Sequence, residues 1–393
     1  MIQTVTRRRT AQVLAAGLLV AGVLGACATK KQTPGPATSS DVASLKKVFE
    51  KSFMVGAALN IEQFEERDAA GVQLIKSQYN TISPENVLKW ENVHPTLGNF
   101  NFVPADRYVD FGTRNKMFIV GHTLVWHSQV PRWVFQDASG QPLKRDSLLA
   151  RMQDHIKTVV TRYKGRVNGW DVVNEALEED GTLRKSPWFN IIGDDYIAKA
   201  FQYAHEADPD AELYYNDYSL ENPAKRAGAI RLIKSLQAQG IPVKAIGMQG
   251  HMKMDWPSVG LEDSTITMFG ALGVKVHVTE LDVDVLPRAT GGNSADVSQR
   301  AAAAASLNPY AAGMPDSVSK ALAKRYADLF GVYQRHAAVI DRVTFWGVAD
   351  GDSWLNNWPV RGRTNYPLLF DRQHQAKAAF NAIIAAAKAA PRQ

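Results

Sequence analysis

Short apolar runs alternate with amphipathic stretches along the chain from about residue 41 onward. Eight of these runs are apolar at nearly every position, which predicts strands that are buried on both faces of a sheet. They span residues 53–59, 80–83, 118–126, 169–174, 212–216, 244–249, 274–280 and 343–348. Between them, apolar positions recur at helical spacing. Clear examples are residues 146–163, 196–207, 224–239 and 375–390.

Buried strands that alternate with helices are typical of a parallel sheet, and eight such units predict a (β/α)₈ TIM barrel of the α/β class. We expect one barrel domain over residues 42–391. A doubly wound open sheet is the alternative, but no glycine-rich phosphate loop follows the first predicted strand. Residues 287–317 break the alternation and are too long for an ordinary connection. We expect an insertion that borders the barrel mouth, with a helical part around residues 301–305.

The N-terminal residues differ in composition from the rest. Arg7, Arg8 and Arg9 precede an apolar run that ends in small residues, which is the pattern of an export signal. The tetrapeptide LGAC resembles the cleavage box of bacterial lipoproteins, so residues 1–26 are predicted to be a lipoprotein signal peptide and Cys27 to carry the lipid. An ordinary signal peptide and a short membrane span are the alternatives. Residues 27–41, rich in Pro, Ser and Thr, predict a flexible tether.

A lipidated Cys27 would export the protein and hold it at a bacterial membrane, facing the periplasm or the cell surface. Ala28 gives no sign of inner-membrane retention, which favours the outer membrane. Because Cys27 is the single cysteine, no intramolecular disulfide is possible. The net charge of +6 lies partly outside the predicted elements, which argues against nucleic-acid binding. Nine Trp and 12 Tyr are more informative, because flat aromatic rings form platforms in ligand clefts.

Polar and aromatic residues collect where the predicted strands end, and in a barrel these ends form one mouth. Glu175 follows the fourth predicted strand and Glu280 the seventh. Paired carboxylates across a cleft cleave glycosidic bonds, because one protonates the leaving oxygen while the other attacks the anomeric carbon or activates water. The acid needs partial desolvation or a nearby negative charge to keep its proton, whereas the nucleophile needs hydrogen-bond donors. Glu178, Glu179 and Asp180 are expected to be solvated loop acids.

The segments around both acids, WDVVNE and VHVTELD, resemble the two active-site signatures of glycoside hydrolase family 10, the endo-β-1,4-xylanases. The likeness extends in order through ENVLKWENVHP, GHTLVWHSQVPRW, IGMQGH, TFWGVADGDSW and PLLFD, from about Val48 to the C-terminus. It implies a retaining hydrolase of xylan and xylo-oligosaccharides that needs no cofactor. Glu175 would be the acid/base and Glu280 the nucleophile that forms a covalent xylosyl-enzyme. Retention implies carboxyl groups about 5–5.5 Å apart.

The resemblance also implies the roles of the surrounding residues. Asn174 would bind the sugar 2-hydroxyl, and His251 would orient Glu280, with Gln249 beside it and Asp282 orienting the histidine. Trp90 is expected to pack behind the site. The implied substrate contacts are Glu85, Asn86, Lys89, His122 and Trp126 on the glycone side, Trp346 and Trp354 beside the cleavage point, and Tyr218 and Asn216 on the leaving-group side. Without the motif, His251 at a strand end would more simply cap the backbone, and core packing is an alternative role for Trp346.

Other classes remain open at this point. A non-catalytic lipoprotein that holds xylan at the cell surface would also use the tether. A hydrolase of the same barrel type could act on β-1,4-glucan, because the preference for xylan depends on Lys89, Trp346 and Trp354. A metal-dependent sugar isomerase is less favoured, since His122 and His127 lack the helical spacing of a zinc motif. No G-x-S-x-G serine nucleophile motif is present.

One segment departs from the family pattern. SWLNNWPVRGRTN carries an extra Trp358 and two arginines, Arg361 and Arg363, which we expect at the rim on the leaving-group side. We expect a monomer with no nucleic-acid partner.

Overall fold

The computed structural model describes residues 43–287 and 306–389. The predicted signal peptide, Cys27 and the tether lie outside these ranges, as does most of the 287–317 segment, including its expected helical part. Those predictions therefore stay predictions. Within the described residues, no helix is both long enough and apolar enough to cross a membrane.

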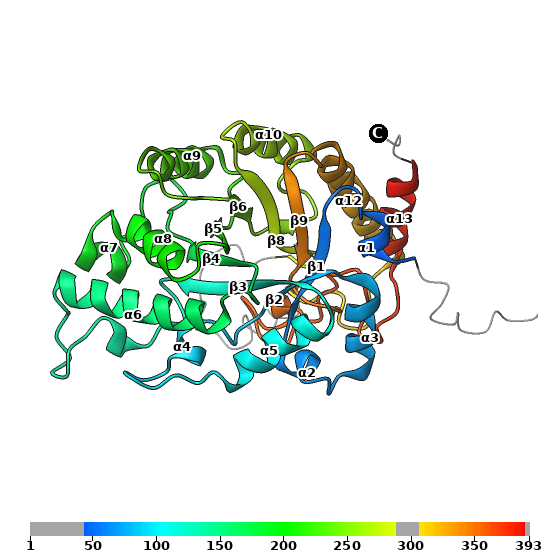
Figure 1. Ribbon diagram of the computed structural model, residues 1–393. Helices are drawn as coiled ribbons and strands as arrows, with labels where there is room; N and C mark the ends of the chain where they lie inside the picture. Colours follow the sequence, from blue (N-terminus) through cyan, green and yellow to red (C-terminus); the bar gives the residue numbers. More distant parts are fainter. Residues whose placement is uncertain (1–42, 288–305, 390–393) are drawn as a thin grey trace, which may run out of the picture. The chain divides into compact units, whose positions relative to one another are not determined.

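Eight parallel strands close into a barrel, which confirms the predicted fold and excludes an open sheet (Figure 1). Each strand pairs with the next in the barrel, and β6 pairs with β8 and β1 with β9 to complete it. The barrel strands are β1 (Met54–Leu59), β2 (Thr81–Pro84), β3 (Phe118–Val125), β4 (Gly169–Asn174), β5 (Glu212–Asp217), β6 (Ala245–Met248), β8 (Lys275–Asp284) and β9 (Ile340–Phe345).

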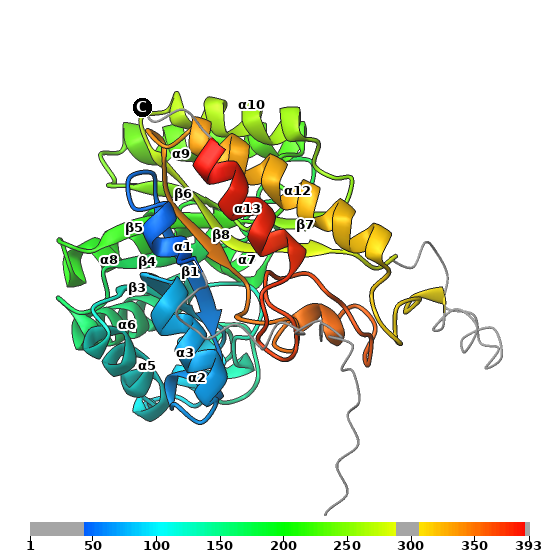
Figure 2. The same cartoon turned by 90° about the vertical axis from the view of Figure 1, so that its right-hand side faces the viewer.

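Helices surround the strands, and α12 and α13 lie side by side (Figure 2). The longer helices are α3 (Ala69–Gln78), α5 (Val103–Arg114), α6 (Arg145–Tyr163), α8 (Tyr196–Ala207), α9 (Pro223–Ala238), α10 (Val259–Gly270), α12 (Asp316–Arg335) and α13 (Ala378–Ala389). The shorter ones are α1 (Leu45–Val48), α2 (Ile61–Phe64), α4 (Trp90–Val93) and α7 (Pro187–Ile192), with 3₁₀ turns η1 (Arg132–Val134) and η2 (Trp354–Asn356). The four helices predicted as examples are present, with ends shifted by at most three residues.

Local sequence signals explain where some of these helices begin. Asn222 precedes α9, and its side chain accepts a hydrogen bond from the N–H of Ala224. Pro223 then occupies the first turn, where its missing N–H costs nothing. Ser258 caps α10 in the same way, through the N–H of Leu261.

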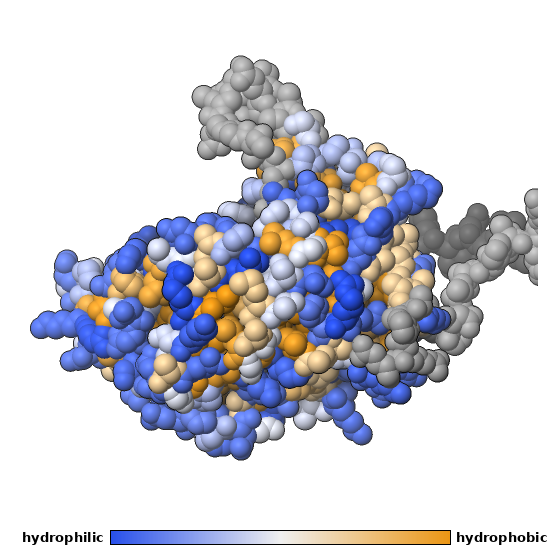
Figure 3. All heavy atoms as spheres, turned by 90° about the horizontal axis from the view of Figure 1, so that it is seen from above, coloured by the Kyte–Doolittle hydropathy of each residue, from blue (hydrophilic) through white to orange (hydrophobic). Residues whose placement is uncertain are grey.

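Burial along the strands follows the predicted pattern. All six residues of β4 and all four of β6 are buried, so both faces of these strands are covered. One face contributes to the barrel interior and the other packs under the helices. On the surface, the face shown in Figure 3 has polar residues along its outline and mixed polar and apolar residues at its centre.

Two strands differ from the prediction by more than one residue at an end, β8 and β9. β8 does not end at Glu280 but continues to Asp284, because a short strand, β7 (His251–Lys253), pairs with its last residues. β9 begins at Ile340 and ends at Phe345, about three residues earlier than predicted. Its polar residue Arg342 concealed the start, although this side chain is only 1% exposed.

Candidate active site

The backbone at Glu175 turns sharply where β4 ends. Its φ of 58° lies in the left-handed region, which a glutamate rarely adopts. Two hydrogen bonds hold this conformation. The N–H of Glu175 donates to the carbonyl oxygen of Asn216 on β5 at 2.9 Å, and its carbonyl oxygen accepts from Nε of Arg184 at 3.0 Å. The turn therefore aims the side chain away from the strand and fixes it there.

The half-buried carboxylate of Glu175 is held by two neutral donors. Nε1 of Trp126, which follows β3, donates to Oε2 at 2.8 Å. Nε2 of Gln249, which follows β6, donates to Oε1 at 2.9 Å. Side chains from the ends of three different strands thus meet here, as a barrel mouth requires. Neither donor carries a charge, which suits a carboxyl group that must exchange a proton.

Glu280 is more deeply buried, at 5% exposure, and lies within β8. Nδ2 of Asn216 donates to its Oε1 at 2.9 Å, and Nε2 of His251 lies 3.2 Å from its Oε2. Burial raises the pKa of Glu280, but the hydrogen bond from His251, the neighbouring imidazole of His122 and the Asn216 amide outweigh it. They hold this pKa below its usual value. Glu280 therefore stays ionised near neutral pH, as a nucleophile must.

His251 connects Glu280 to a second acid. Its Nδ1 lies 3.1 Å from Oδ1 of Asp282, so both ring nitrogens face carboxylate oxygens. Both must donate, which requires the imidazolium form. Although burial opposes the charge, the two carboxylates raise the pKa of His251 to about 10. Nε1 of Trp354 donates to the other oxygen of Asp282 at 2.8 Å and so fixes the orienting acid.

One hydrogen-bond network joins the two carboxylates. Oδ1 of Asn174 accepts from Nδ2 of Asn216 at 2.9 Å and from Nε2 of Gln249 at 3.4 Å. Because Asn216 also binds Glu280 and Gln249 also binds Glu175, both acids border the same space. The oxygen of Asn174 is thereby occupied, which leaves its NH₂ group as the donor available to a ligand.

Asn216 does not lie where the resemblance suggested. It was expected on the leaving-group side, but it is fully buried and supports Glu280. Oδ1 of Asn216 accepts a hydrogen bond from Oγ1 of Thr279 at 2.7 Å. This bond fixes the orientation of the Asn216 side-chain amide. The side chain therefore positions Glu280 and has no surface for a sugar.

Comparison with known proteins identifies the family of the chain. Residues 44–386 match the family model described as Glycosyl hydrolase family 10. This chain belongs to that family. It is 44% identical over 351 residues to the endo-1,4-beta-xylanase A of Xylanibacter ruminicola, covering 89% of this chain and 95% of that protein. It is 42% identical over 353 residues to a beta-1,4-xylanase of Dictyoglomus thermophilum, covering 88% and 92%.

Solved structures show the same barrel. A family 10 endoxylanase retrieved from a sugarcane soil metagenome superposes with a TM-score of 0.83 at 44% identity, covering 88% of this chain and 99% of that one. A mutant of the intracellular xylanase TsXylA from Thermoanaerobacterium saccharolyticum, in complex with xylotriose, gives a TM-score of 0.76 at 38% identity, covering 88% and 99%.

The expected glycone side of this family 10 site is built around Lys89, which is 7% exposed. Its Nζ donates to Oδ1 of Asn86 at 3.0 Å and to Oε1 of Gln129 at 2.8 Å, and it lies 5.2 Å from the ring centre of Trp126. Burial lowers the pKa of Lys89, and nearby carboxylates oppose that shift. They are those of Glu280, Glu85, Glu175 and Glu91. Gln129 lies within a quoted motif, but its partnership with Lys89 was not predicted.

Glu85 lies beside a second polar cluster that the sequence did not reveal. Burial raises the pKa of Glu85, and the charge of Asp352 raises it further, although Lys89 opposes this. Asp352 accepts hydrogen bonds from Nδ2 of Asn60 at 3.2 Å and from Nε2 of Gln63 at 3.0 Å. Asn60 and Gln63 are three residues apart and form a capping box at the start of α2. Glu85 and Asp352 lie far from them in the chain, and no local pattern in the sequence brings these two acids to that box.

Aromatic rings surround the two histidines of the site. Trp346 is 8% exposed and meets His122 edge-on at 5.5 Å and His251 at 6.3 Å between ring centres. The ring of Trp354 lies 4.9 Å from that of His251. Trp346 is therefore packed in the barrel and also borders the site. Nδ1 of His122 lies 2.9 Å from Oδ2 of Asp171, so Asp171 orients this imidazole.

Trp90 packs behind the site, as expected. It is 3% exposed and stacks on His155 with 3.6 Å between ring centres. Lys89 directly precedes it, at the N-cap position of α4.

Tyr218 belongs to a cluster beneath the turn at Glu175. Its hydroxyl accepts from Nη2 of Arg184 at 2.9 Å, and Nζ of Lys225 lies 3.3 Å from its ring centre. Lys225 also forms a fully buried ion pair with Asp217 at 3.0 Å. Arg184 therefore links Tyr218 to the backbone of Glu175, which the sequence did not predict.

The acids in the loop after β4 are exposed, whereas one arginine of the loop after β9 is buried. Glu178 and Glu179 are 43% and 55% exposed at their side chains, and each forms a long ion pair, so both are solvated as predicted. Trp358 is 62% exposed. Arg363 was expected at the rim but is 4% exposed, because its guanidinium donates to three backbone carbonyls. Across residues 43–287 and 306–389, no cluster of three or more His, Cys, Asp or Glu could hold a metal ion.

Proposed function

We propose that this chain is a retaining endo-1,4-β-xylanase that hydrolyses internal β-1,4-xylosidic bonds of xylan, with Glu175 as acid/base and Glu280 as nucleophile. The observation that carries the proposal is the network through Asn174, Asn216 and Gln249. It joins an ionised, cation-supported carboxylate to a second carboxylate held only by neutral donors. Two carboxylates in such unequal surroundings are suited to unequal roles.

The first chemical step forms a covalent sugar–enzyme bond. A carboxylate oxygen of Glu280 attacks the anomeric carbon while Glu175 gives its proton to the glycosidic oxygen, which leaves with the aglycone chain. Asn216 and His251 keep Glu280 ionised and oriented during the attack. The free NH₂ of Asn174 is placed to donate to the sugar 2-hydroxyl.

The second step releases the sugar. Glu175, now a carboxylate, takes a proton from water, and the resulting hydroxide attacks the anomeric carbon and displaces Glu280. Trp126 and Gln249 hold Glu175 in place through both steps. Two inversions at the same carbon give net retention of configuration.

The preference for xylan over glucan is part of the proposal. The relatives at 44% and 42% identity are named xylanases, and the structure of TsXylA holds xylotriose. The resemblance to family 10 implies that Lys89, Trp346 and Trp354 crowd the hydroxymethyl group of a hexose. We expect a much higher rate on xylan than on carboxymethylcellulose. A higher rate on carboxymethylcellulose would favour the glucanase alternative.

The roles of the two acids are tested together. Glu280→Ala should lower the release of reducing ends from xylan by several orders of magnitude. A 2-deoxy-2-fluoro-xylobioside with a good leaving group should label Glu280 covalently, as seen by mass spectrometry of peptides. Glu175→Ala should lose activity on xylan and regain it in azide with an activated aryl glycoside. Glu179→Gln, which changes an exposed loop acid, is the matched control. Near wild-type activity of Glu280→Ala would refute the assignment.

We also propose that the chain is a monomeric lipoprotein, anchored through Cys27 to the bacterial membrane, with the outer membrane favoured. The support is the LGAC box, the apolar run before it and the tether of residues 27–41. In a bacterial host, labelled palmitate should enter the full chain and not the Cys27→Ser variant. Membrane fractionation then locates the anchor, and light scattering of the delipidated protein measures its oligomeric state.

A further inference from the structure

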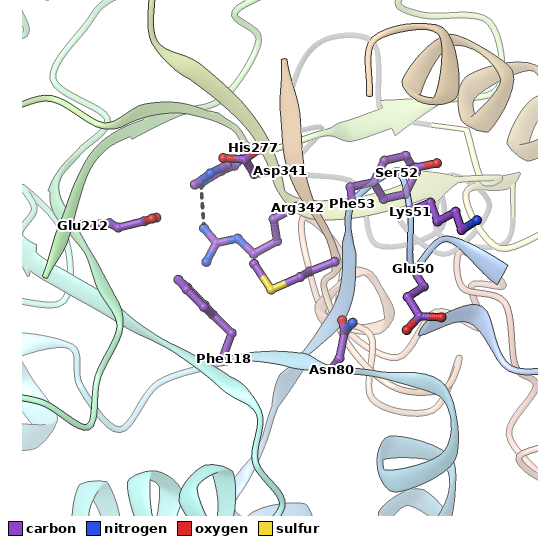
Figure 4. A pocket seen from close by; sticks show the side chains of 11 residues that line it. Glu50, Lys51, Ser52, Phe53, Asn80, Phe118, Glu212, His277, Asp341 and Arg342 are labelled. Carbon is purple, nitrogen blue, oxygen red and sulfur yellow. Dashed lines mark hydrogen bonds between the residues drawn. The ribbon is translucent and has the colours of Figure 1, made fainter. Parts of the chain in front are cut away.

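A cavity of about 270 Å³ lies at the end of the barrel opposite the active site (Figure 4). Met54, Phe118 and Glu212 line it, and these are the first residues of β1, β3 and β5. Asn174 and the other catalytic groups lie at the strand ends instead. We call this space the floor cavity. Nothing in the proposed reaction uses it.

Arg342 of β9 is the unusual residue of the floor cavity. It is 1% exposed, and its guanidinium lies between His277, Phe118 and Glu212 (Figure 4). Nη2 donates to Nδ1 of His277 at 3.1 Å, and the guanidinium carbon lies 5.1 Å from the ring centre of Tyr214. Among residues 43–287 and 306–389, Nε and Nη1 have no hydrogen-bond acceptor, and no carboxylate forms an ion pair with Arg342.

An arginine keeps its charge at any physiological pH, so this charge cannot be removed by proton loss. A buried charge without a counter-charge is strongly unfavourable, and buried donors without acceptors add to the cost. The guanidinium of Arg342 therefore favours a small acceptor of negative charge within the cavity.

The surroundings of Arg342 carry further positive charge. The pKa of His277 lies well below its ordinary value because of burial and the charges of Arg342, Lys244 and Lys275. The imidazole is therefore neutral. Since its Nδ1 accepts from Arg342, its proton is on Nε2, which adds another donor.

The acids at the cavity limit what it can hold. Glu212 already accepts from the hydroxyl of Tyr214 at 2.6 Å, and Asp341 is paired with Lys275 at 3.0 Å. Glu50 is an exposed acid of the cavity lining. These three carboxylates repel an ion of high charge, such as a phosphate dianion, more strongly than a single charge.

We propose that the floor cavity binds a small monovalent anion, a halide or a small carboxylate such as formate, against the guanidinium of Arg342. The anion supplies the acceptor and the counter-charge that the protein does not provide. It stabilises the start of β9 against β1 and β8, where Arg342 lies opposite Met54 and His277.

Calorimetry of the full chain tests the proposal. The protein is prepared in halide-free buffer and unfolded thermally during separate titrations with sodium chloride, bromide and formate. An anion that binds the folded state at ten times its dissociation constant should raise the melting temperature by about 2 °C, in a saturable manner. Arg342→Met should lose the saturable part. Lys51→Gln removes the same charge from an exposed residue of the lining and should keep it.

Crystallography covers the case in which Arg342→Met does not fold. Wild-type crystals soaked in bromide should show anomalous density within hydrogen-bonding distance of Nε or Nη1 of Arg342, and formate should compete with it. The proposal is overturned if the cavity holds only water and no anion gives a saturable shift. It is also overturned if Lys51→Gln abolishes the shift while Arg342→Met retains it. Xylan hydrolysis by Lys51→Gln should be unchanged. A failure of the anion-binding proposal can therefore be distinguished from a failure of the proposed function.

Discussion

His251 faces Glu280 through Nε2 at 3.2 Å while its other nitrogen faces Asp282 at 3.1 Å. A cation thus lies between two carboxylates, one of which is the proposed nucleophile. Glu280 is nearly inaccessible to water, and burial alone would favour its protonated form. The contact with His251 is therefore the largest of the interactions that keep the buried Glu280 ionised, with His122 and Asn216 adding to it.

Replacing His251 with Asn should move the acid limb of the pH–activity profile. Without the imidazolium, the pKa of Glu280 rises, so activity is lost at a higher pH on acidification. We expect the acid limb of kcat/KM to shift upward by about one unit. His336→Asn is the matched control, because His336 contacts Asp263 far from the site at 3.2 Å. An unchanged acid limb in His251→Asn would contradict the role of this histidine.

The contacts of His251 with Glu280 and Asp282 also affect the stability of the folded protein. The pKa of His251 is about 10 in the folded protein, above its ordinary value of 6.5. Its ionic contribution to the free energy of unfolding is therefore complete below pH 6.5 and is lost as pH rises through 10. The difference in melting temperature between wild type and His251→Asn should be constant below neutral pH and should shrink near pH 10. A difference that grows at alkaline pH would be inconsistent with a buried imidazolium.

Arg184 should act on catalysis through the backbone of Glu175. Arg184→Met removes the donor that holds the carbonyl oxygen of a residue at a φ of 58°. The acid should then drift from the leaving oxygen. Because small displacements of a catalytic group are costly, we expect kcat to fall by about 10–100-fold on xylobiosides with poor leaving groups. Dinitrophenyl xylobioside, which needs little acid assistance, should be far less affected.

The control for Arg184 is Glu178→Gln, which removes its 3.3 Å ion-pair partner but leaves the bond to Glu175. Its kinetics should resemble those of the wild type. If Arg184→Met lowers the rates on both classes of substrate equally, Arg184 acts on general stability and does not position the acid.

Glu262 should limit the stability of the barrel at alkaline pH. It is a fully buried residue of α10, beside Glu221 and the hydroxyl group of Tyr333. Burial and the neighbouring Glu221 raise its pKa well above the ordinary value of 4.5. A raised carboxyl pKa means that the folded state holds an extra proton, so stability present below pH 4.5 is lost as pH rises.

Glu262→Gln removes this titration with little change in shape. Its melting temperature relative to the wild type should increase steadily from pH 5 to pH 9. Glu50→Gln, a change at an exposed acid, should show no such trend. The idea fails if the difference between Glu262→Gln and wild type is independent of pH.

Two buried histidines predict a loss of stability at acidic pH, the opposite of the dependence that Glu262 predicts at alkaline pH. Nδ1 of His94 lies 3.2 Å from Nδ1 of His155, and burial lowers the pKa of His94 from 6.5 to about 4. The pair contributes stability above pH 6.5, and that contribution is lost as pH falls through 4. His94→Phe should cost about 1–3 kcal/mol at neutral pH, because the buried hydrogen bond is lost. Denaturant unfolding should show this difference narrowing as pH approaches 4.

The sequence alone determined the class of the fold and indicated the two acids that we propose as catalytic. Apolar runs buried on both faces require a parallel sheet covered by helices, and eight of them are enough to close a barrel. The acids were found because Glu175 and Glu280 lie within short motifs whose residues are adjacent in the chain. Trp90 was also placed correctly, because a large aromatic side chain that follows a polar strand end is stabilised by packing into the core.

Only the tertiary structure decided which side chains meet. Asn216 contacts Glu280 across 64 positions of sequence, and no local pattern shows that it supports this carboxylate instead of binding the sugar. β8 passes Glu280 because β7 pairs with it, which is a non-local hydrogen-bonding choice. Arg342 reads as a surface residue in the sequence, yet barrel closure buries it. Burial and pairing depend on which strands become neighbours, and that is settled only when the barrel closes.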